Sequence, residues 1–319
     1  MPTTTVSIQP SLFGEEEEVA ASNTPFFAEK PAHMGPTVVD YIQSRQILTR
    51  ATGFMDSYNF TLNPYSGCSF GCSYCYAAFF NYDKSKEQTW GEWVTVKENA
   101  VTLMQKCRKG SLNGKRIYMS SVTDPYQPIE SRLNLTRQLL EVLAENHEPK
   151  LVVQTRSPIV TRDIDLYRRI KENGGRVQVN MTITTDDEAV RKAFEPSCPS
   201  NAQRLKAISQ MQSSGIDSCI TLTPLLLVND SQQFIDELIS SDVRHFIIQP
   251  FHFRKGRFVA GTRDKALDLL TEKLRCGKEQ IASEYKEIYQ DFLQRMKTEL
   301  KRRDLPDLGE GKDGFKPPF

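Results

Sequence analysis

Asn63-Pro-Tyr-Ser-Gly-Cys-Ser-Phe-Gly-Cys-Ser-Tyr-Cys-Tyr76 is the most informative stretch of this sequence, because it places three cysteines within eight residues. Cys68, Cys72 and Cys75 follow the spacing C-x3-C-x2-C. A structural zinc site uses four protein ligands, and a disulfide framework pairs its cysteines in even numbers. A cuboidal iron–sulfur cluster that is held by three thiolates instead leaves one iron open to another ligand. The motif therefore predicts a cluster with an open iron.

This motif resembles the signature of the radical S-adenosylmethionine (SAM) superfamily, in which an aromatic residue, here Tyr74, precedes the last cysteine. The resemblance implies a [4Fe–4S] cluster held by Cys68, Cys72 and Cys75, with SAM on the open iron. It also implies reductive cleavage of SAM to a 5′-deoxyadenosyl radical that abstracts hydrogen from the substrate, with electrons from a donor such as flavodoxin or ferredoxin. The alternative is a zinc knuckle or a chance cluster. Such a zinc site needs a fourth ligand, and no His or Cys lies between Cys75 and Cys107.

The composition predicts a soluble cytoplasmic protein. The 319 residues include 41 Lys and Arg against 40 Asp and Glu, so any nucleic-acid binding must come from local patches. Seven cysteines without a long apolar run indicate a reducing compartment and no membrane span. We expect a disordered N-terminal arm over residues 1–40, a radical SAM core over 41–270, and a C-terminal helix and tail over 271–319.

The arm contains Gln9-Pro-Ser-Leu-Phe13, which resembles the short peptide by which bacterial DNA-repair and replication proteins dock on the sliding clamp. An incidental apolar pair in a tail is the alternative. This stretch therefore gives only a weak indication of a sliding-clamp partner.

Short β-branched runs alternate with amphipathic helical stretches, which predicts a parallel sheet built from β–α units. Six runs are strand candidates: Tyr58–Leu62, Arg116–Ser120, Leu151–Thr155, Val177–Ile183, Ser218–Thr223 and His245–Pro250. Six units fit an α/β fold of the open (β/α)6 partial TIM-barrel type, which the resemblance also implies. In such barrels the chemistry lies at the C-terminal ends of the strands.

Polar residues follow every one of these strands, as that fold requires. The first strand leads into the cysteine loop, and the others end in Ser120–Asp124, Gln154–Arg156, Thr182–Asp186, Thr221–Thr223 and Gln249–His252. Helix N-caps are the alternative explanation for Ser, Thr and Asp at these positions. Arg156 does not fit that explanation, because an Arg places positive charge beside a helix N-terminus. We expect a bound carboxylate beside it.

From Gly53 to Phe253 the chain is similar to spore photoproduct lyase and its relatives, which use the radical to reverse a thymine dimer in DNA. The resemblance rests on Gly67–Tyr76, Thr123-Asp124 with Ile129-Glu130, Phe194-Glu-Pro196 with Arg204-Leu205, and Ile248-Gln249 near Phe253. It implies that Tyr74 lies near the adenine and that Arg156 replaces a Lys beside the SAM carboxylate. It further implies cofactor contacts from Thr184, Thr185 and the Ser121 loop, and a hydrogen-atom relay by Tyr76.

One departure concerns the lyase reaction itself. Ser121 occupies the position where the lyase has a hydrogen-donating cysteine, and a serine O–H bond is too strong for that role. Another thiol must donate, with Cys198 favoured over the strand residue Cys219, or the substrate differs. Three functions therefore stay open: DNA photoproduct repair, radical modification of RNA, a peptide or a small molecule, and a non-catalytic metal-binding interaction module.

The C-terminal part of the sequence gives two further expectations. Arg254-Lys-Gly-Arg-Phe258 mixes basic and aromatic residues and is a candidate phosphate-binding stretch, with a solvated loop as the alternative. Residues 278–303 predict a long amphipathic helix. The final stretch, Lys312–Phe319, is either loose or docked by its aromatic residues.

Overall fold

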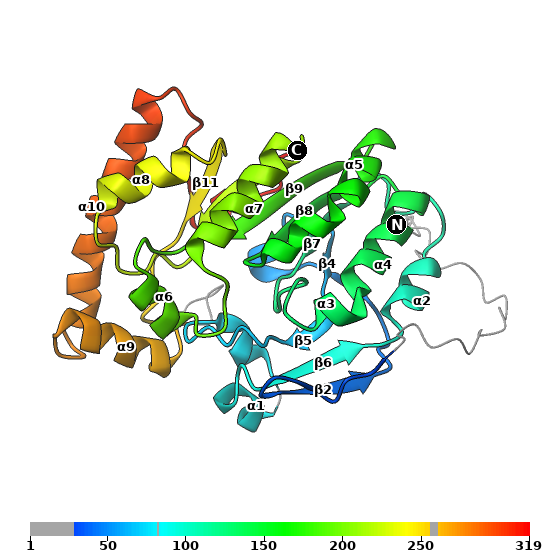
Figure 1. The fold of residues 1–319 in the computed structure, drawn as a ribbon, viewed down its shortest axis with the longest axis horizontal. Coiled ribbons are helices and arrows are strands. Elements are labelled where there is room, and N and C mark those ends of the chain that lie inside the picture. The colour runs from blue at the N-terminus through cyan, green and yellow to red at the C-terminus, as the bar shows by residue number, and fades with distance from the viewer. Residues whose placement is uncertain (1–28, 82, 256–260) are drawn as a thin grey trace, which may run out of the picture.

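The computed structural model describes residues 29–81, 83–255 and 261–319 (Figure 1). The clamp-like stretch Gln9–Phe13 and the last three residues of the basic stretch, 256–258, lie outside the described residues, so both stay predictions.

An eight-stranded sheet with the order β12-β11-β10-β9-β8-β7-β4-β3 forms the centre of the fold. Its strands are β3 (Leu48–Arg50), β4 (Phe60–Leu62), β7 (Arg116–Met119), β8 (Lys150–Thr155), β9 (Arg176–Thr182), β10 (Asp217–Leu222), β11 (His245–Ile248) and β12 (Gly309–Glu310). The strands from β4 to β11 pair in parallel. All six predicted strands are confirmed, with small shifts at their ends. Because β3 and β12 are separate edges, the sheet forms an open barrel.

Helices connect the strands and cover the outer face of the sheet (Figure 1). The main ones are α2 (Ala100–Gln105), α4 (Leu135–Asn146), α5 (Ile164–Glu172), α6 (Glu188–Phe194), α7 (Asn201–Ser213), α8 (Ser231–Ile239), α9 (Asp264–Leu274) and α10 (Ile281–Arg302). In α4 one apolar face is buried: Leu135, Leu139, Leu140 and Leu143 have no exposed surface. The long helix predicted over residues 278–303 is α10. Among the residues described, no helix has the length and apolar character that a membrane span needs.

A second sheet, which the sequence did not indicate, lies beside the barrel. It has the order β1-β2-β6-β5 and consists of β1 (His33–Met34), β2 (Thr37–Ile42), β6 (Trp93–Lys97) and β5 (Tyr65–Gly67). β2 pairs with β6 through five residue pairs, and Val39 is buried against the core. The last residues of the predicted arm, from His33 to residue 40, therefore form strands. This sheet supports the cysteine loop, because that loop begins where β5 ends.

The C-terminal tail connects the two edges of the open sheet. β12 pairs with β11 at one edge, and the short helix α11 (Gly311–Gly314) follows it. Phe315 and Phe319 then pack against the small apolar cluster of Ala51, Tyr58, Tyr118 and Val152. An ion pair joins Lys312 to Asp56, with 2.6 Å between Nζ and Oδ2. The tail is thus docked by its aromatic residues, which was one of the two expectations for it.

Candidate active site and cofactor pocket

The cysteine loop is held in place by close packing at two glycines, one before Cys68 and one before Cys72. Gly67 has φ +75°, and a Cβ there would lie 2.5 Å from the Trp93 ring. Gly71 has φ +61° and faces Gly91, whose Cα would lie 3.2 Å from an added Cβ. Both positions require glycine, since a side chain would meet a positive φ and a filled space. The sequence around the cysteines therefore fixes the path of the loop as well as supplying its thiols.

One cavity of about 660 Å³ contains most of the predicted site. Its lining includes Cys68, Cys72, Cys75, Tyr74, Tyr76, Ser121 and Arg156. It also includes Ser120, Thr123, Asp124, Gln154, Thr223, Gln249 and His252, which lie at the C-terminal ends of the strands as predicted. All the cysteines within the described residues are free thiols. The structure thus brings the three cysteines and Arg156 to the same cavity, although they come from segments far apart in the sequence.

Glu195 is the centre of the polar network behind this cavity. Its carboxylate is fully buried and accepts hydrogen bonds from four side chains: Arg204 at 2.5 Å, Thr184 at 2.9 Å, Arg156 at 3.1 Å and the Tyr74 hydroxyl. Arg156 also donates to the Tyr74 oxygen, with Nη1 at 2.8 Å. Two guanidinium groups therefore share a single carboxylate next to the cysteines.

These charges decide the protonation state of Glu195. Burial by itself raises the pKa of the carboxyl, but Arg204, Arg156 and the Tyr74 hydrogen bond outweigh burial and lower that pKa to about 2. Glu195 is consequently ionised at neutral pH. Its negative charge keeps the Arg156 guanidinium at the cavity wall.

The three cysteine thiols differ in their electrostatic surroundings. A hydrogen bond with Cys198 lowers the pKa of Cys72. The positive charge of Arg156 also lowers this pKa, whereas burial raises it. Burial raises the pKa of Cys68 well above its usual value, and burial together with Cys72 raises the pKa of Cys75 to about 11. Because metal ligands must be deprotonated, Cys72 is the thiol that is best prepared to bind a metal.

Asp124 links the ends of two neighbouring strands and orients Arg156. Its Oδ1 accepts hydrogen bonds from the Tyr126 N–H at 2.9 Å and from the Thr155 hydroxyl at 2.7 Å. Its Oδ2 accepts the backbone N–H of Arg156 at 2.9 Å. Asp124 is buried, so these bonds fix the turn from which the Arg156 side chain extends toward Glu195.

Ser121 and Tyr76 lie together at another part of the cavity wall. The Ser121 hydroxyl accepts from Asn63 Nδ2 at 3.1 Å, and the Ser121 N–H donates to Asn63 Oδ1 at 2.9 Å. The Tyr76 hydroxyl donates to the Ser121 carbonyl. Tyr76 is nevertheless 48% exposed, and its ring contacts the exposed ring of Phe80 edge to face.

Thr184 and Thr185, both predicted to contact the cofactor, lie behind the cavity instead of in its lining. Both are fully buried. Thr184 donates to Glu195, as described above, and Thr185 donates to the Leu227 carbonyl at 2.5 Å. Through these hydrogen bonds they support the cavity wall from its buried side. A contact between either residue and the cofactor stays a prediction.

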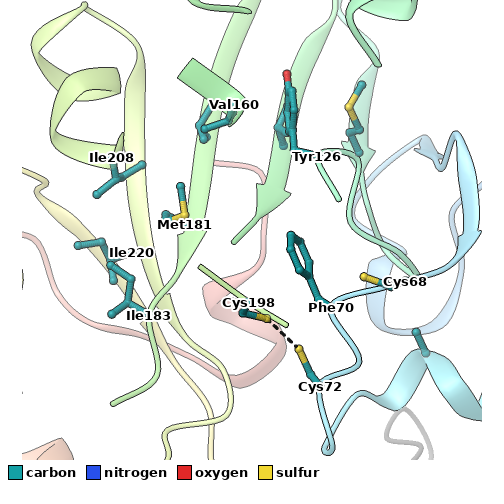
Figure 2. Packing of buried hydrophobic residues seen from close by; sticks show 14 of the residues in the cluster. Cys68, Phe70, Cys72, Tyr126, Val160, Met181, Ile183, Cys198, Ile208 and Ile220 are labelled. Carbon is teal, nitrogen blue, oxygen red and sulfur yellow. Dashed lines mark hydrogen bonds between the residues drawn. The ribbon is translucent and has the colours of Figure 1, made fainter. Parts of the chain in front are cut away.

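Sequence reasoning missed three residues that the structure places beside the cysteine loop. Glu195 and Arg204 were noted only as part of a family resemblance, and Cys198 was considered only as a hydrogen donor. Cys198 Sγ instead lies 3.6 Å from Cys72 Sγ (Figure 2), and Cys198 is not among the residues that line the cavity. No local pattern in the sequence indicated this role: Arg204 lies in the first turn of α7, and only the structure shows that it has no exposed surface.

Another part of the cavity lining, here called the barrel side, consists of Tyr118, Gln154, Thr182, Phe54 and Phe315. Gln154 Nε2 donates to the hydroxyls of Thr182 at 2.8 Å and Thr221 at 2.9 Å, and its Oε1 accepts from Tyr118 at 3.0 Å. The rings of Phe54 and Phe315 meet edge to face with centroids 5.7 Å apart. These side chains are uncharged, and they suit a ligand with amide-like polar groups and flat apolar faces.

The donor set fits an iron–sulfur cluster. Three thiols face one cavity, and the neighbouring guanidinium of Arg156 is available to an anionic ligand. Within residues 29–81, 83–255 and 261–319, no group of three or more His, Cys, Asp or Glu side chains is arranged to hold a metal ion. The thiolates of a cuboidal cluster bind separate irons, so a cluster does not require them to converge on one point.

Comparison with known proteins identifies the family. The Radical SAM superfamily model matches residues 62–238, which is more than half of the chain. This chain belongs to the radical SAM superfamily. Members of this superfamily are enzymes that use a [4Fe–4S] cluster and SAM and take electrons from donors of the flavodoxin or ferredoxin type.

Two relatives with similar sequences are described as uncharacterized proteins. One, from Methanocaldococcus jannaschii, is 36% identical over 171 residues, which cover 52% of this chain and 60% of the relative. Another, from Mycobacterium tuberculosis strain H37Rv, is 27% identical over 188 residues, which cover 57% of this chain and 54% of the relative. The match thus spans little more than half of each relative's length.

The similar solved structures include spore photoproduct lyases. A lyase complexed with a dinucleoside spore photoproduct is 17% identical with a TM-score of 0.46, and the match covers 66% of this chain and 60% of the lyase. A lyase mutant is 16% identical with a TM-score of 0.49, covering 74% of this chain and 77% of that one. Similarity at this level does not extend to substrate or reaction.

Proposed function

We propose that this enzyme binds SAM beside Cys68, Cys72 and Cys75 and directs hydrogen abstraction at a substrate held on the barrel side of the same cavity. The observation that carries the proposal is that one cavity joins the three cysteines and Arg156 to Gln154, Tyr118 and Phe315. When bound, the cluster and SAM supply the 5′-deoxyadenosyl radical. The protein supplies position and keeps water out.

Arg156 and Tyr74 are the residues that we assign to SAM. The Arg156 guanidinium lies at the cavity wall and suits the SAM carboxylate, because a planar fork binds a carboxylate through two parallel hydrogen bonds. Glu195 holds this guanidinium in place from the buried side. The Tyr74 ring, fixed through its hydroxyl, is assigned to the adenine.

The substrate that we favour is a nucleic acid, with a base in the cavity. The amide of Gln249 suits the polar edge of a base, and the exposed rings of Tyr76 and Phe80 suit stacking by neighbouring bases. DNA photoproduct repair is the candidate reaction in this class.

Radical modification of RNA, a peptide or a small molecule is the second candidate, and Ser121 favours it. Among the described residues, the only cysteines in the cavity lining are the three predicted cluster ligands. A reaction that ends with hydrogen donation from a free thiol in the cavity therefore lacks its donor. We assign the role of hydrogen-atom donor to Tyr76, because a phenol O–H gives up hydrogen more readily than a serine O–H.

SAM cleavage is the first test. The protein is purified without oxygen, loaded with iron and sulfide, reduced and mixed with SAM, and 5′-deoxyadenosine is measured by chromatography. We expect wild-type protein to form it and Cys72→Ala to form none. Cys219→Ala, which changes a buried cysteine of β10 outside the cavity lining, is the matched control and should retain the activity. Cleavage by Cys72→Ala at the wild-type rate would contradict the proposal.

Substrate class needs a separate measurement. We expect UV-irradiated DNA to bind more tightly than undamaged DNA if photoproduct repair is the reaction. Equal binding, or none, rejects photoproduct repair and favours the second candidate.

A further inference from the structure

The segment from Phe194 to Cys198 contacts the cysteine loop residue by residue. The contacts are Ser73 N–H to the Phe194 carbonyl at 2.8 Å, the Tyr74 hydroxyl to Glu195, and Cys72 Sγ to Cys198 Sγ at 3.6 Å. Figure 2 shows Cys198 facing Cys72 across this junction. Three consecutive residues of the loop are therefore held by a segment that lies more than a hundred residues later in the chain.

The Cys198 thiol has a fixed position. Its backbone N–H donates to the Glu195 carbonyl at 3.1 Å, and its carbonyl accepts from Arg191 Nη1 at 2.8 Å. Arg191 is itself buried and paired with Glu188. With 8% of its surface exposed and no place in the cavity lining, Cys198 is directed at Cys72 and not at the substrate.

Cluster geometry limits what a second thiol at this position can do. Each iron of a cuboidal cluster is already bound by three sulfides, which leaves one position for a protein ligand. Cys72 and Cys198 therefore cannot both bind one iron. Once Cys72 is a ligand it is a thiolate without a proton, so the hydrogen of an S–H···S contact must come from Cys198.

We propose that Cys198 donates a hydrogen bond to the Cys72 thiolate and thereby raises the reduction potential of the cluster. Hydrogen bonds to the sulfurs are one of the features that set cluster potentials. Reduction adds negative charge, part of which lies on the thiolate ligands, and a donor stabilises that charge. The inference rests on the cysteine-bound cluster and is independent of the choice of substrate.

An EPR-monitored redox titration of reconstituted protein tests this proposal. Wild type is compared with Cys198→Ala, Cys198→Ser and the control Cys219→Ala, with iron and sulfide measured per chain for each. We expect full clusters in all four proteins and a more negative midpoint potential in Cys198→Ala. Cys198→Ser keeps a donor and should stay closer to wild type, and Cys219→Ala should match wild type.

A second measurement separates the hydrogen bond from a packing effect. Pulsed electron–nuclear double resonance on the reduced cluster, in H2O and in D2O, should show an exchangeable proton in wild type that Cys198→Ala lacks. An unchanged potential in a fully loaded Cys198→Ala overturns the proposal. So does loss of the cluster from both Cys198 variants, because Cys198 would then be needed to hold the cluster and not to set its potential.

Discussion

On its cofactor side the cavity is lined by thiols and by Arg156, whereas the five residues of its barrel side carry uncharged amide, hydroxyl and aromatic side chains, with Arg50 elsewhere in the lining. On the cofactor side, Arg156 has a buried partner in Glu195. Glu195 pairs in turn with Arg204 at 2.5 Å, and neither of these two residues has exposed surface. The second side is completed by Phe315 of the docked C-terminal tail. The cofactor side is thus held in place by buried ion pairs, and the barrel side is shaped by the packing of its side chains.

This difference teaches where the chain can tolerate change. A buried ionic network loses several kcal/mol when one partner is removed, because the remaining charge stays buried. Packing at a partly exposed surface loses less and can readjust. We therefore expect the cofactor side to be sensitive to substitution, and the barrel side to change its shape while the fold persists.

Arg204→Met should give the largest effect on stability. The substitution removes the salt bridge to Glu195 and the hydrogen bonds to the carbonyls of Thr182 and Pro199. We expect the free energy of unfolding to fall by about 3–5 kcal/mol, as for other broken buried ion pairs. Urea unfolding of the cluster-free protein, followed by circular dichroism, measures it.

The matched control is Arg302→Met on α10, whose side chain is 65% exposed and pairs with Glu299. A solvent-screened surface ion pair contributes little to stability, so this variant should stay close to wild type. Equal losses in the two variants would remove the distinction between the buried network and the surface.

Acid stability should depend on Glu195. Its folded pKa of about 2 lies below the usual value of 4.5, so its contribution is present above the unfolded pKa and is lost as the pH falls toward 2. A shift of this size corresponds to about 3 kcal/mol. In Glu195→Gln we expect the unfolding free energy to fall less steeply between pH 5 and pH 2 than in wild type, as measured by urea unfolding at each pH.

The surface variant Glu237→Gln on α8 controls for the loss of one carboxylate. If Glu195→Gln retains the wild-type acid dependence, then the Arg156 and Arg204 charges do not act on Glu195 as described here.

The difference between local and long-range contacts explains which features could be predicted from the sequence. The six strands were predictable because each is a short β-branched run with its own periodicity, and the three candidate cluster ligands stood out because they lie within one loop. The contacts of Tyr74 with Glu195 and of Cys72 with Cys198 span 121 and 126 residues, so no local pattern indicates them. Their partners become visible only when the barrel brings α6 and the loop after it against the cysteine loop.

The second sheet and the strand β12 were missed for a related reason. β1 and β5 have only two and three residues, too few for a periodic pattern, and β2 falls in a region whose preceding composition is typical of disorder. β12 likewise has two residues and is a strand because β11 is already in place beside it. Such elements depend on the tertiary structure and not on their own sequences.

Phe315→Ala should give the smallest effect on stability and the clearest effect on the barrel side. Phe315 is partly buried, and we expect a loss of about 1–2 kcal/mol from its edge contact with Phe54 and its share of the apolar cluster. Phe319→Ala is the matched control, because Phe319 packs on the same cluster but does not line the cavity. Urea unfolding should show similar losses in the two variants, and SAM binding, measured by calorimetry on the reconstituted protein, should be unchanged in both.

Binding of UV-irradiated DNA should change in Phe315→Ala alone, since only that substitution enlarges the barrel side. A change in SAM affinity in Phe315→Ala would mean that the two sides of the cavity are coupled, and that the tail acts on the cofactor as well as on the substrate.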